Sequence, residues 1–244
     1  MGIINLTPDS FYDGGNLRSD HDLLSKTEGM LEEGATFLDI GGYSSRPGAD
    51  FVSEETELKR VLPAIQLILR EFPDALLSVD TFRSMIAMEC VLAGASLVND
   101  ISGGSLDKQM IGTIAKLNVP YVMMHMRGSP ENMMENTRYD HLTNEILFYF
   151  SEKISMANEV GINDIIIDPG FGFSKTLDQN FELLNELELL KHLEQPILVG
   201  VSRKSFIYKT LKTSAEEALN GTTILNSISL FKGADILRVH DVKE

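Results

Sequence analysis

The chain has 244 residues, 43% of them hydrophobic, so one domain over residues 1–244 can bury a large core and nothing requires a second. The formal net charge is −15 without any basic run, which argues against nucleic acid and anionic membrane surfaces as partners. Cys90 is the only cysteine, and the sequence shows no secretory signal or long apolar run, so we expect a cytoplasmic protein without an internal disulfide.

Short apolar segments that end in polar residues recur along the chain. The predicted strands cover residues 1–5, 36–40, 76–79, 96–98, 121–124, 165–168, 197–199 and 235–237. Apolar residues at helical spacing predict helices over residues 23–31, 54–68, 85–92, 110–114, 146–154, 176–187 and 214–230. Thr176-x-x-Gln179 and Ser214-x-x-Glu217 have the spacing of capping boxes, which start helices.

Eight strands alternating with seven helices form the pattern of an α/β fold, a (β/α)8 TIM barrel whose last helix is absent from the given sequence. Asp241-x-x-Glu244 resembles the start of a capped helix. We therefore expect the natural chain to continue past Glu244, because without an eighth helix the seam between the eighth and first strands would be open.

Polar residues end these strands, and in such a barrel the strand ends share one mouth. They are Asn5, Asp39, Asp80, Asn99, His125, Asp168 and Lys204, with Arg238 and His240 after the last strand. A single Asp or Asn at such a position is as readily a turn cap as a ligand. The full set indicates a polar site.

The chemistry of this set points to a heterocyclic ligand. Asp80, Asn99, Asp168 and Lys204 suit a planar, nitrogen-rich ring, because carboxylates accept from ring N–H groups and lysine donates to a carbonyl. A solvated cluster of ion pairs is the alternative. Arg46, Arg238 and His240 add donors for phosphate oxygens, whereas Arg203 is expected at the surface.

The histidines do not have the spacing of transition-metal ligands, and we expect His21, His141 and His192 on exposed helix surfaces. Mg²⁺ is compatible with the sequence, since it keeps most of its waters and needs few protein oxygens, one of which Asn5 could supply. Residues 173–176 are similar to a phosphate-binding loop, but Ser174 stands where that motif requires glycine, so a nucleotide triphosphatase is not expected.

The chain resembles the dihydropteroate synthase family over its whole length. The resemblance lies in residues 1–11, 39–48, 78–81, 99–104, 124–126, 168–173, 202–205 and 238–240. It implies the same barrel, usually as a homodimer, and a reaction that joins 7,8-dihydropterin-6-ylmethyl diphosphate to p-aminobenzoate, giving dihydropteroate and pyrophosphate in folate synthesis. The family is also a sulfonamide target.

The resemblance also implies roles for individual residues. The pterin would be held by Asp80, Asn99, Asp168 and Lys204, with Met124 packing nearby. The diphosphate and its Mg²⁺ would be held by Asn5, Arg46, Arg238 and His240, with Asn5 as the metal ligand. The p-aminobenzoate side would comprise Phe11, Ser45, Arg46, Pro47, Phe173, Lys204 and Ser205. Asn5, Asp80, Asp168, Lys204, Arg238 and His240 would serve catalysis, and the loops at residues 6–15 and 42–52 would order over the substrates.

Three positions depart from the family pattern. Tyr43 stands where the family commonly has Glu, Ser45 where it has Thr, and Ser174 where it has Gly. Ser45 keeps the hydroxyl, while Ser174 would be strained if its φ is positive. Two other readings of the barrel stay open: a pterin-binding methyltransferase, which would not need Arg46, Arg238 and His240 around a diphosphate, and a non-catalytic pterin carrier.

Overall fold

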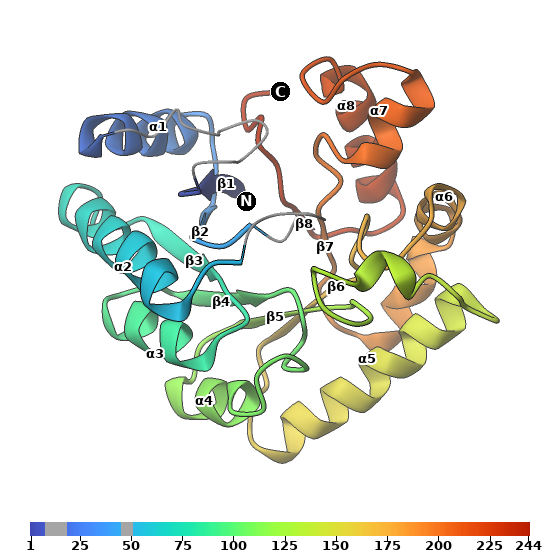
Figure 1. Ribbon diagram of the computed structural model, residues 1–244, viewed down its shortest axis with the longest axis horizontal. Coiled ribbons are helices and arrows are strands. Elements are labelled where there is room, and N and C mark those ends of the chain that lie inside the picture. Colours follow the sequence, from blue (N-terminus) through green and yellow to red (C-terminus); the bar gives the residue numbers. More distant parts are fainter. Residues whose placement is uncertain (8–18, 45–50) are drawn as a thin grey trace.

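The computed structural model describes residues 1–7, 19–44 and 51–244. Parallel strands lie at its centre and helices surround them (Figure 1). Six strands pair in chain order into one sheet: β1 (Gly2–Asn5), β2 (Phe37–Gly41), β3 (Leu76–Asp80), β4 (Leu97–Asp100), β5 (Tyr121–Met124) and β6 (Ile165–Asp168). A second sheet pairs β7 (Leu198–Val199) with β8 (Ile236–Leu237). Each predicted strand is therefore present.

Backbone contacts join the two sheets into a barrel. Ile167 N–H donates to Pro196 O (2.9 Å) beside β7, and Ile3 N–H donates to Val239 O (2.9 Å) just after β8. The backbone is thus hydrogen-bonded across the seam between the last and first strands. On its outer side lies a groove of about 530 Å³, lined by residues that include Gly34, Phe37, Asn226 and Leu230.

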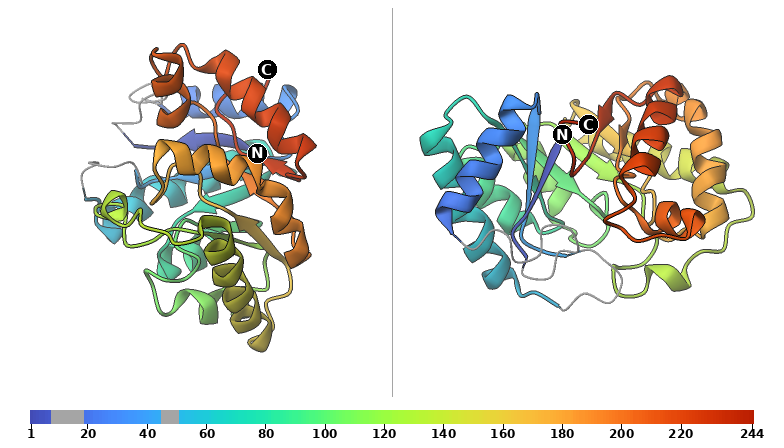
Figure 2. Two further views of the ribbon diagram at one scale, coloured as in Figure 1. Left: turned by 90° about the vertical axis from the view of Figure 1, so that its right-hand side faces the viewer. Right: turned by 90° about the horizontal axis from the view of Figure 1, so that it is seen from above.

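The helices cover the outside of the barrel, and α1 and α8 flank the seam between β8 and β1 (Figure 2). The α-helices are α1 (Asp20–Glu32), α2 (Glu54–Glu71), α3 (Ser84–Leu92), α4 (Met110–Leu117), α5 (Leu142–Glu159), α6 (Leu177–Asn185), α7 (Ser205–Leu211) and α8 (Leu219–Phe231). Short 3₁₀ helices occur at Met133–Glu135 (η1) and Leu187–Leu193 (η2). None of these helices is long and apolar enough to cross a membrane.

Two helix predictions need correction. The short helix α7 was not predicted, although it buries Phe206 and Ile207 against the core. The capping box expected at Ser214 is wrong, because α8 begins at Leu219 without a side-chain cap. The predicted box of Thr176 and Gln179 is confirmed at the start of α6.

The barrel interior divides into two layers along the strands. Because alternate residues of a strand point to the same face, an inward residue is followed two positions later by another. The lower layer is apolar and contains Leu97, Val122, Ile166 and Leu198. Two residues further on, Asn99 and Asp168 place polar atoms above it. The larger apolar cluster packs between the strands and the helices.

Candidate active site

A layer of polar side chains crosses the barrel at the carboxyl ends of the strands. Asp80 of β3 lies in register with Asn99 of β4, and Met124 of β5 lies in register with Asp168 of β6. Side-chain hydrogen bonds also connect this layer with Asp39 of β2 and with Arg238, which follows β8. The expectation that the polar strand ends converge is therefore met for these residues.

Arg238 connects strands from opposite ends of the sequence. Its Nε donates to Asp39 Oδ2 (2.6 Å) and its Nη2 donates to Asp80 Oδ2 (2.7 Å). Burial works against the charged guanidinium, but Asp39 and Asp80 outweigh this effect and raise its pKa. Burial also raises the pKa of Asp80 to about 7, although Arg238 opposes the change. Arg238, Asp39 and Asp80 therefore form a cluster of ion pairs in which the pKa of Asp80 lies near neutrality.

Asp39 is a site residue to which the sequence analysis gave no role. Its side chain is fully buried, and its Oδ2 also accepts from Asn99 Nδ2 (2.9 Å). Its Oδ1 has no hydrogen-bond partner in the described part of the chain. Since Asn99 Nδ2 is directed to Asp39, this carboxylate sets the orientation of the Asn99 amide as well as that of Arg238. The signal available in the sequence was its position at a strand end.

Asp168 and Lys204 are held by the loop that follows β6. Gly170 N–H donates to Asp168 Oδ1 (2.8 Å), and Lys204 Nζ donates to Phe171 O (2.5 Å). Burial raises the pKa of Asp168, against the effect of Lys204, and burial lowers the pKa of Lys204 to about 8, against the effect of Asp168. The layer thus combines hydrogen-bond acceptors with a donor whose charge changes near neutral pH.

Of the residues expected around a diphosphate, Asn5, Arg238 and His240 lie in or beside this layer, and Arg46 falls outside the described residues. His240 Nδ1 and Ser202 Oγ are 3.0 Å apart. A Cβ added at Gly41 would lie 3.5 Å from Asp80 Oδ2 and 3.7 Å from Asn5 Oδ1, so both oxygens approach the same spot. No group of three or more His, Cys, Asp or Glu side chains suited to a metal occurs among residues 1–7, 19–44 and 51–244. The donor set fits a hard cation that binds mainly through waters and phosphate oxygens.

The expected p-aminobenzoate side is described only in part. Lys204 Nζ lies 4.8 Å from the centroid of the Phe173 ring, and Ser205 is the exposed first residue of α7. Phe173 also packs against a small cluster that contains Met124 and Met126. The other predicted members, which lie in the two long loops, fall outside the described residues; these are Phe11, Ser45, Arg46 and Pro47.

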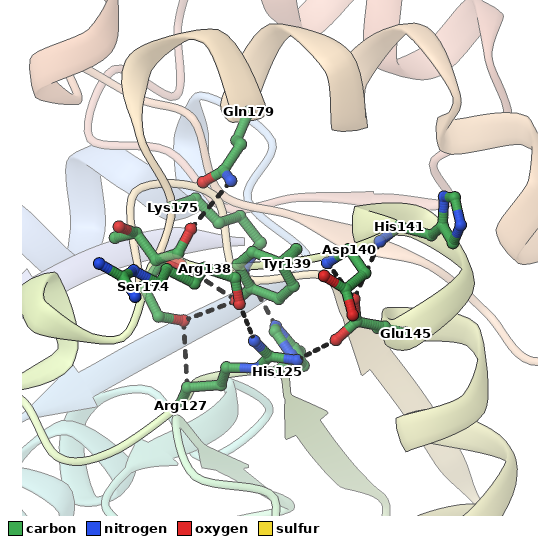
Figure 3. A network of polar contacts seen from close by, with 11 residues as sticks. His125, Arg127, Arg138, Tyr139, Asp140, His141, Glu145, Ser174, Lys175 and Gln179 are labelled. Atoms are coloured by element: carbon green, nitrogen blue, oxygen red, sulfur yellow. Dashed lines mark hydrogen bonds and ion pairs between the residues drawn. The ribbon is translucent and has the colours of Figure 1, made fainter.

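Ser174 has the positive φ that the sequence analysis considered, at 48°. Its hydroxyl accepts from Arg127 N–H (3.0 Å), and Tyr139 O–H donates to its carbonyl oxygen (3.0 Å), as Figure 3 shows. A non-glycine residue in this conformation costs about 1 kcal/mol or more. The hydrogen bond from Arg127 N–H to the hydroxyl, which a glycine could not accept, offsets part of that cost.

Arg203 corrects another expectation. It was predicted at the surface, but its side chain is buried and forms a two-pronged ion pair with Asp241, Nε to Oδ2 at 2.8 Å and Nη2 to Oδ1 at 2.9 Å. It therefore fixes the segment after β8 to the start of α7. His21, His141 and His192 are exposed on or beside helices, as predicted.

Tyr43, near the start of the second long loop, belongs to an aromatic cluster. Its ring meets that of Phe82 edge to face at 5.1 Å, and the Arg83 guanidinium carbon lies 5.4 Å from its centroid. Arg83 in turn pairs with the buried Glu57. A tyrosine at this position thus contributes packing and a cation–π contact.

Comparison with known proteins agrees with this fold and site. The family model for pterin binding enzymes matches residues 1–240, which places the chain in that class. Dihydropteroate synthase of Clostridium beijerinckii is 44% identical over 100% of this chain and 89% of its own length, and that of Bacillus subtilis is 43% identical over 100% and 84%. The crystal structure of Yersinia pestis dihydropteroate synthase with a sulfonamide drug superposes with a TM-score of 0.95 at 42% identity, covering 100% of this chain and 88% of that one. The chain therefore belongs to the dihydropteroate synthases, transferases of folate synthesis.

Proposed function

We propose that this chain joins 7,8-dihydropterin-6-ylmethyl diphosphate to p-aminobenzoate and releases pyrophosphate. The observation that carries the proposal is the polar layer, in which Asp80, Asn99, Asp168 and Lys204 lie above an apolar floor. A related structure from Xanthomonas albilineans, 39% identical with a TM-score of 0.91 over 100% of this chain and 87% of its own, contains 4-aminobenzoic acid. The family membership and that complex support the choice of substrates.

The pterin is bound by matching donors to acceptors. The carboxylates of Asp80 and Asp168 accept from ring N–H and amino groups, while Lys204 donates to the ring carbonyl. Asn99 can use its amide oxygen, because Asp39 already holds its Nδ2. Met124 packs nearby as an apolar neighbour of the ring.

The reaction needs no protein nucleophile. The bond between the methylene carbon and the diphosphate oxygen breaks, and its electron pair leaves with pyrophosphate. The resulting cationic methylene is stabilised by the nearby carboxylates. The arylamine nitrogen then forms the new bond with its lone pair and loses a proton to water. Phe173, Lys204 and Ser205, with Phe11, Ser45, Arg46 and Pro47 from the two long loops, provide the side from which the amine attacks.

Three donors would receive the leaving group. His240 and Arg46 supply hydrogen bonds to phosphate oxygens, and so does Arg238, whose Nε and Nη2 also bond carboxylates. Mg²⁺ held by Asn5 and by phosphate oxygens would neutralise charge on the departing pyrophosphate.

We place the protein in the cytoplasm because of its composition, and we expect a homodimer because of the family resemblance.

Product identification tests the proposal. Purified protein is incubated with the pterin diphosphate, p-aminobenzoate and Mg²⁺, and the mixture is analysed by mass spectrometry. We expect dihydropteroate to accumulate. If no dihydropteroate forms while the pterin is still bound, a non-catalytic carrier or a methyltransferase becomes the better interpretation.

The pH dependence of kcat/KM for the pterin diphosphate is expected to be bell-shaped. Asp80, whose pKa is raised to about 7, must lose its proton so that both of its oxygens can accept, one from Arg238 and one from the ring, so activity falls below that pH. Lys204, whose pKa is lowered to about 8, must keep its proton to donate as an ammonium, so activity falls above that pH. Steady-state rates at constant ionic strength give both limbs.

The Lys204→Arg variant assigns the basic limb. A guanidinium stays charged at every pH of the assay, so whatever activity remains should lack the fall near pH 8. A basic limb at an unchanged pH in this variant would show that another group causes it.

A further inference from the structure

Lys175 is a buried lysine for which the proposed reaction has no use. Its side chain is 2% exposed, and its Nζ donates to Gly170 O (3.0 Å) and to Phe173 O (3.0 Å). Its third neighbour is Nδ1 of His125, at 3.1 Å. An ammonium has three donors and here meets three acceptors, so the group is fully satisfied by one conformation of the loop.

The two carbonyls that Lys175 holds bracket the turn after β6. Phe173 N–H donates to Gly170 O (3.1 Å), and Gly170 and Gly172 have positive φ values of 72° and 81°. A Cβ at Gly170 would lie 2.1 Å from His125 O, so the turn fits tightly against β5. Lys175 thus holds the carbonyls at both ends of a turn that packs closely against His125.

The backbone atoms that orient the pterin-binding groups lie within this turn. Gly170 N–H bonds Asp168 Oδ1, and Phe171 O accepts from Lys204 Nζ. A shift of the turn would therefore move the carboxylate and the ammonium together.

We propose that Lys175 is a positioning residue for pterin binding: by holding Gly170 O, Phe173 O and His125 Nδ1, it keeps the turn after β6 in the form that presents Asp168 and Lys204 to the ring. The inference deepens the proposed function and rests on it. Lys175 does not touch the substrate in this account. It acts through the backbone of residues 170–173.

A second group of hydrogen bonds holds residues 174–179, which follow the turn (Figure 3). Ser174 bonds Arg127 and Tyr139 as described above, and Gln179 Nε2 donates to Thr137 O (2.9 Å). Arg127 is itself paired with Glu145 of α5. The segment between β5 and α5 is thus hydrogen-bonded to residues 174–179. The turn at residues 170–173 is therefore held by Lys175 and is followed by a segment that is itself held in place.

Burial and the neighbouring charges act in opposite directions on the Lys175 ammonium. Burial lowers its pKa to about 7; Asp168 opposes the change, and Lys204 and Arg127 add to it. Burial, Lys175 and Arg127 lower the pKa of His125 well below its usual value, so that ring is neutral and can accept at Nδ1. The positive charge also lies close enough to Asp168 to favour its ionised form.

Two substitutions of Lys175 and one control test the inference. Lys175→Met removes the donors and the charge at similar length, whereas Lys175→Gln keeps an amide donor. Lys116→Met makes the same chemical change at an exposed site on α4. For each protein, the dissociation constant for the pterin substrate is measured by calorimetry, and hydrogen exchange is followed in a peptide over residues 169–176.

We expect Lys175→Met to weaken pterin binding about 10-fold or more, Lys175→Gln to weaken it less, and Lys116→Met to leave it unchanged. Hydrogen exchange should become faster in residues 169–176 of the Lys175 variants and should stay slow in the strands of the barrel. If Lys175→Met does not fold, Lys175→Gln decides by the same two readouts.

Other outcomes separate the inference from the proposed function. A lower thermal midpoint with unchanged pterin affinity would show that Lys175 serves stability alone, and so would faster exchange throughout the protein without local change at the turn. Absence of pterin binding by the unsubstituted protein would instead contradict the proposed function.

Discussion

Asp168→Asn is expected to weaken pterin binding by roughly 100-fold or more, because an amide N–H would replace an acceptor that faces ring N–H groups. The fold should survive, since the amide oxygen can still accept from Gly170 N–H, as Asp168 Oδ1 does now. Burial already raises the pKa of this carboxyl, so removal of its charge is not expected to destabilise the protein. Calorimetric titration with the pterin substrate measures the loss, and thermal unfolding confirms the fold.

Asp164→Asn is the matched control. This residue precedes the same strand at the opposite end of the barrel, and its side chain is exposed. It removes one negative charge without changing the site, so pterin affinity should be that of the unsubstituted protein. Equal binding by the Asp168→Asn variant would show that Asp168 only caps the turn at Gly170.

Arg238→Met is expected to reduce both stability and pterin affinity. The substitution leaves the fully buried Asp39 without its ionic partner, and breaking a buried pair from one side costs about 3–5 kcal/mol. Pterin affinity should fall because Asp80 loses the donor that orients it. Because Arg238 lowers the pKa of Asp80, this carboxyl should take up its proton at a higher pH in the variant, so the loss of stability should shrink as pH falls towards about 7. Urea unfolding at several pH values measures this.

Two further variants serve as controls for Arg238→Met: Arg70→Met, and Asp39→Asn combined with Arg238→Met. Arg70 pairs with Glu71 on the exposed surface of α2, so its loss should change the free energy of unfolding by less than about 1 kcal/mol. Asp39→Asn combined with Arg238→Met removes the unpaired charge and should recover part of the stability. A double variant less stable than Arg238→Met alone would contradict the ion-pair account, as would a loss no larger than that of Arg70→Met.

The barrel and its polar layer could be predicted because they follow from local periodicity. Ile166 and Asp168 are two residues apart in a short strand, so an apolar floor and a polar rim are both present in the sequence. The rule that strand ends share one mouth then brings Asp80, Asn99 and Asp168 together without further information. The roles of individual residues came from the family resemblance.

The missed features depend on contacts between distant parts of the chain. Arg203 is buried because Asp241, far along the sequence, offers two carboxylate oxygens, and no pattern around Arg203 indicates this. Asp39 accepts hydrogen bonds from both Asn99 and Arg238, and only the folded barrel brings these three residues together. Helix α7 is too short for a periodic signal, and the conformation of Ser174 is stabilised by Arg127 and Tyr139.

Pyrophosphate release tests the central claim most directly. The protein is supplied with the pterin diphosphate and Mg²⁺, and sustained release is followed before and after addition of p-aminobenzoate. Our account predicts steady-state release that requires the arylamine and yields one pyrophosphate for each dihydropteroate. Sustained release at the same rate without p-aminobenzoate, or none after it is added, would contradict the proposal that this barrel transfers a pterin methylene to an arylamine.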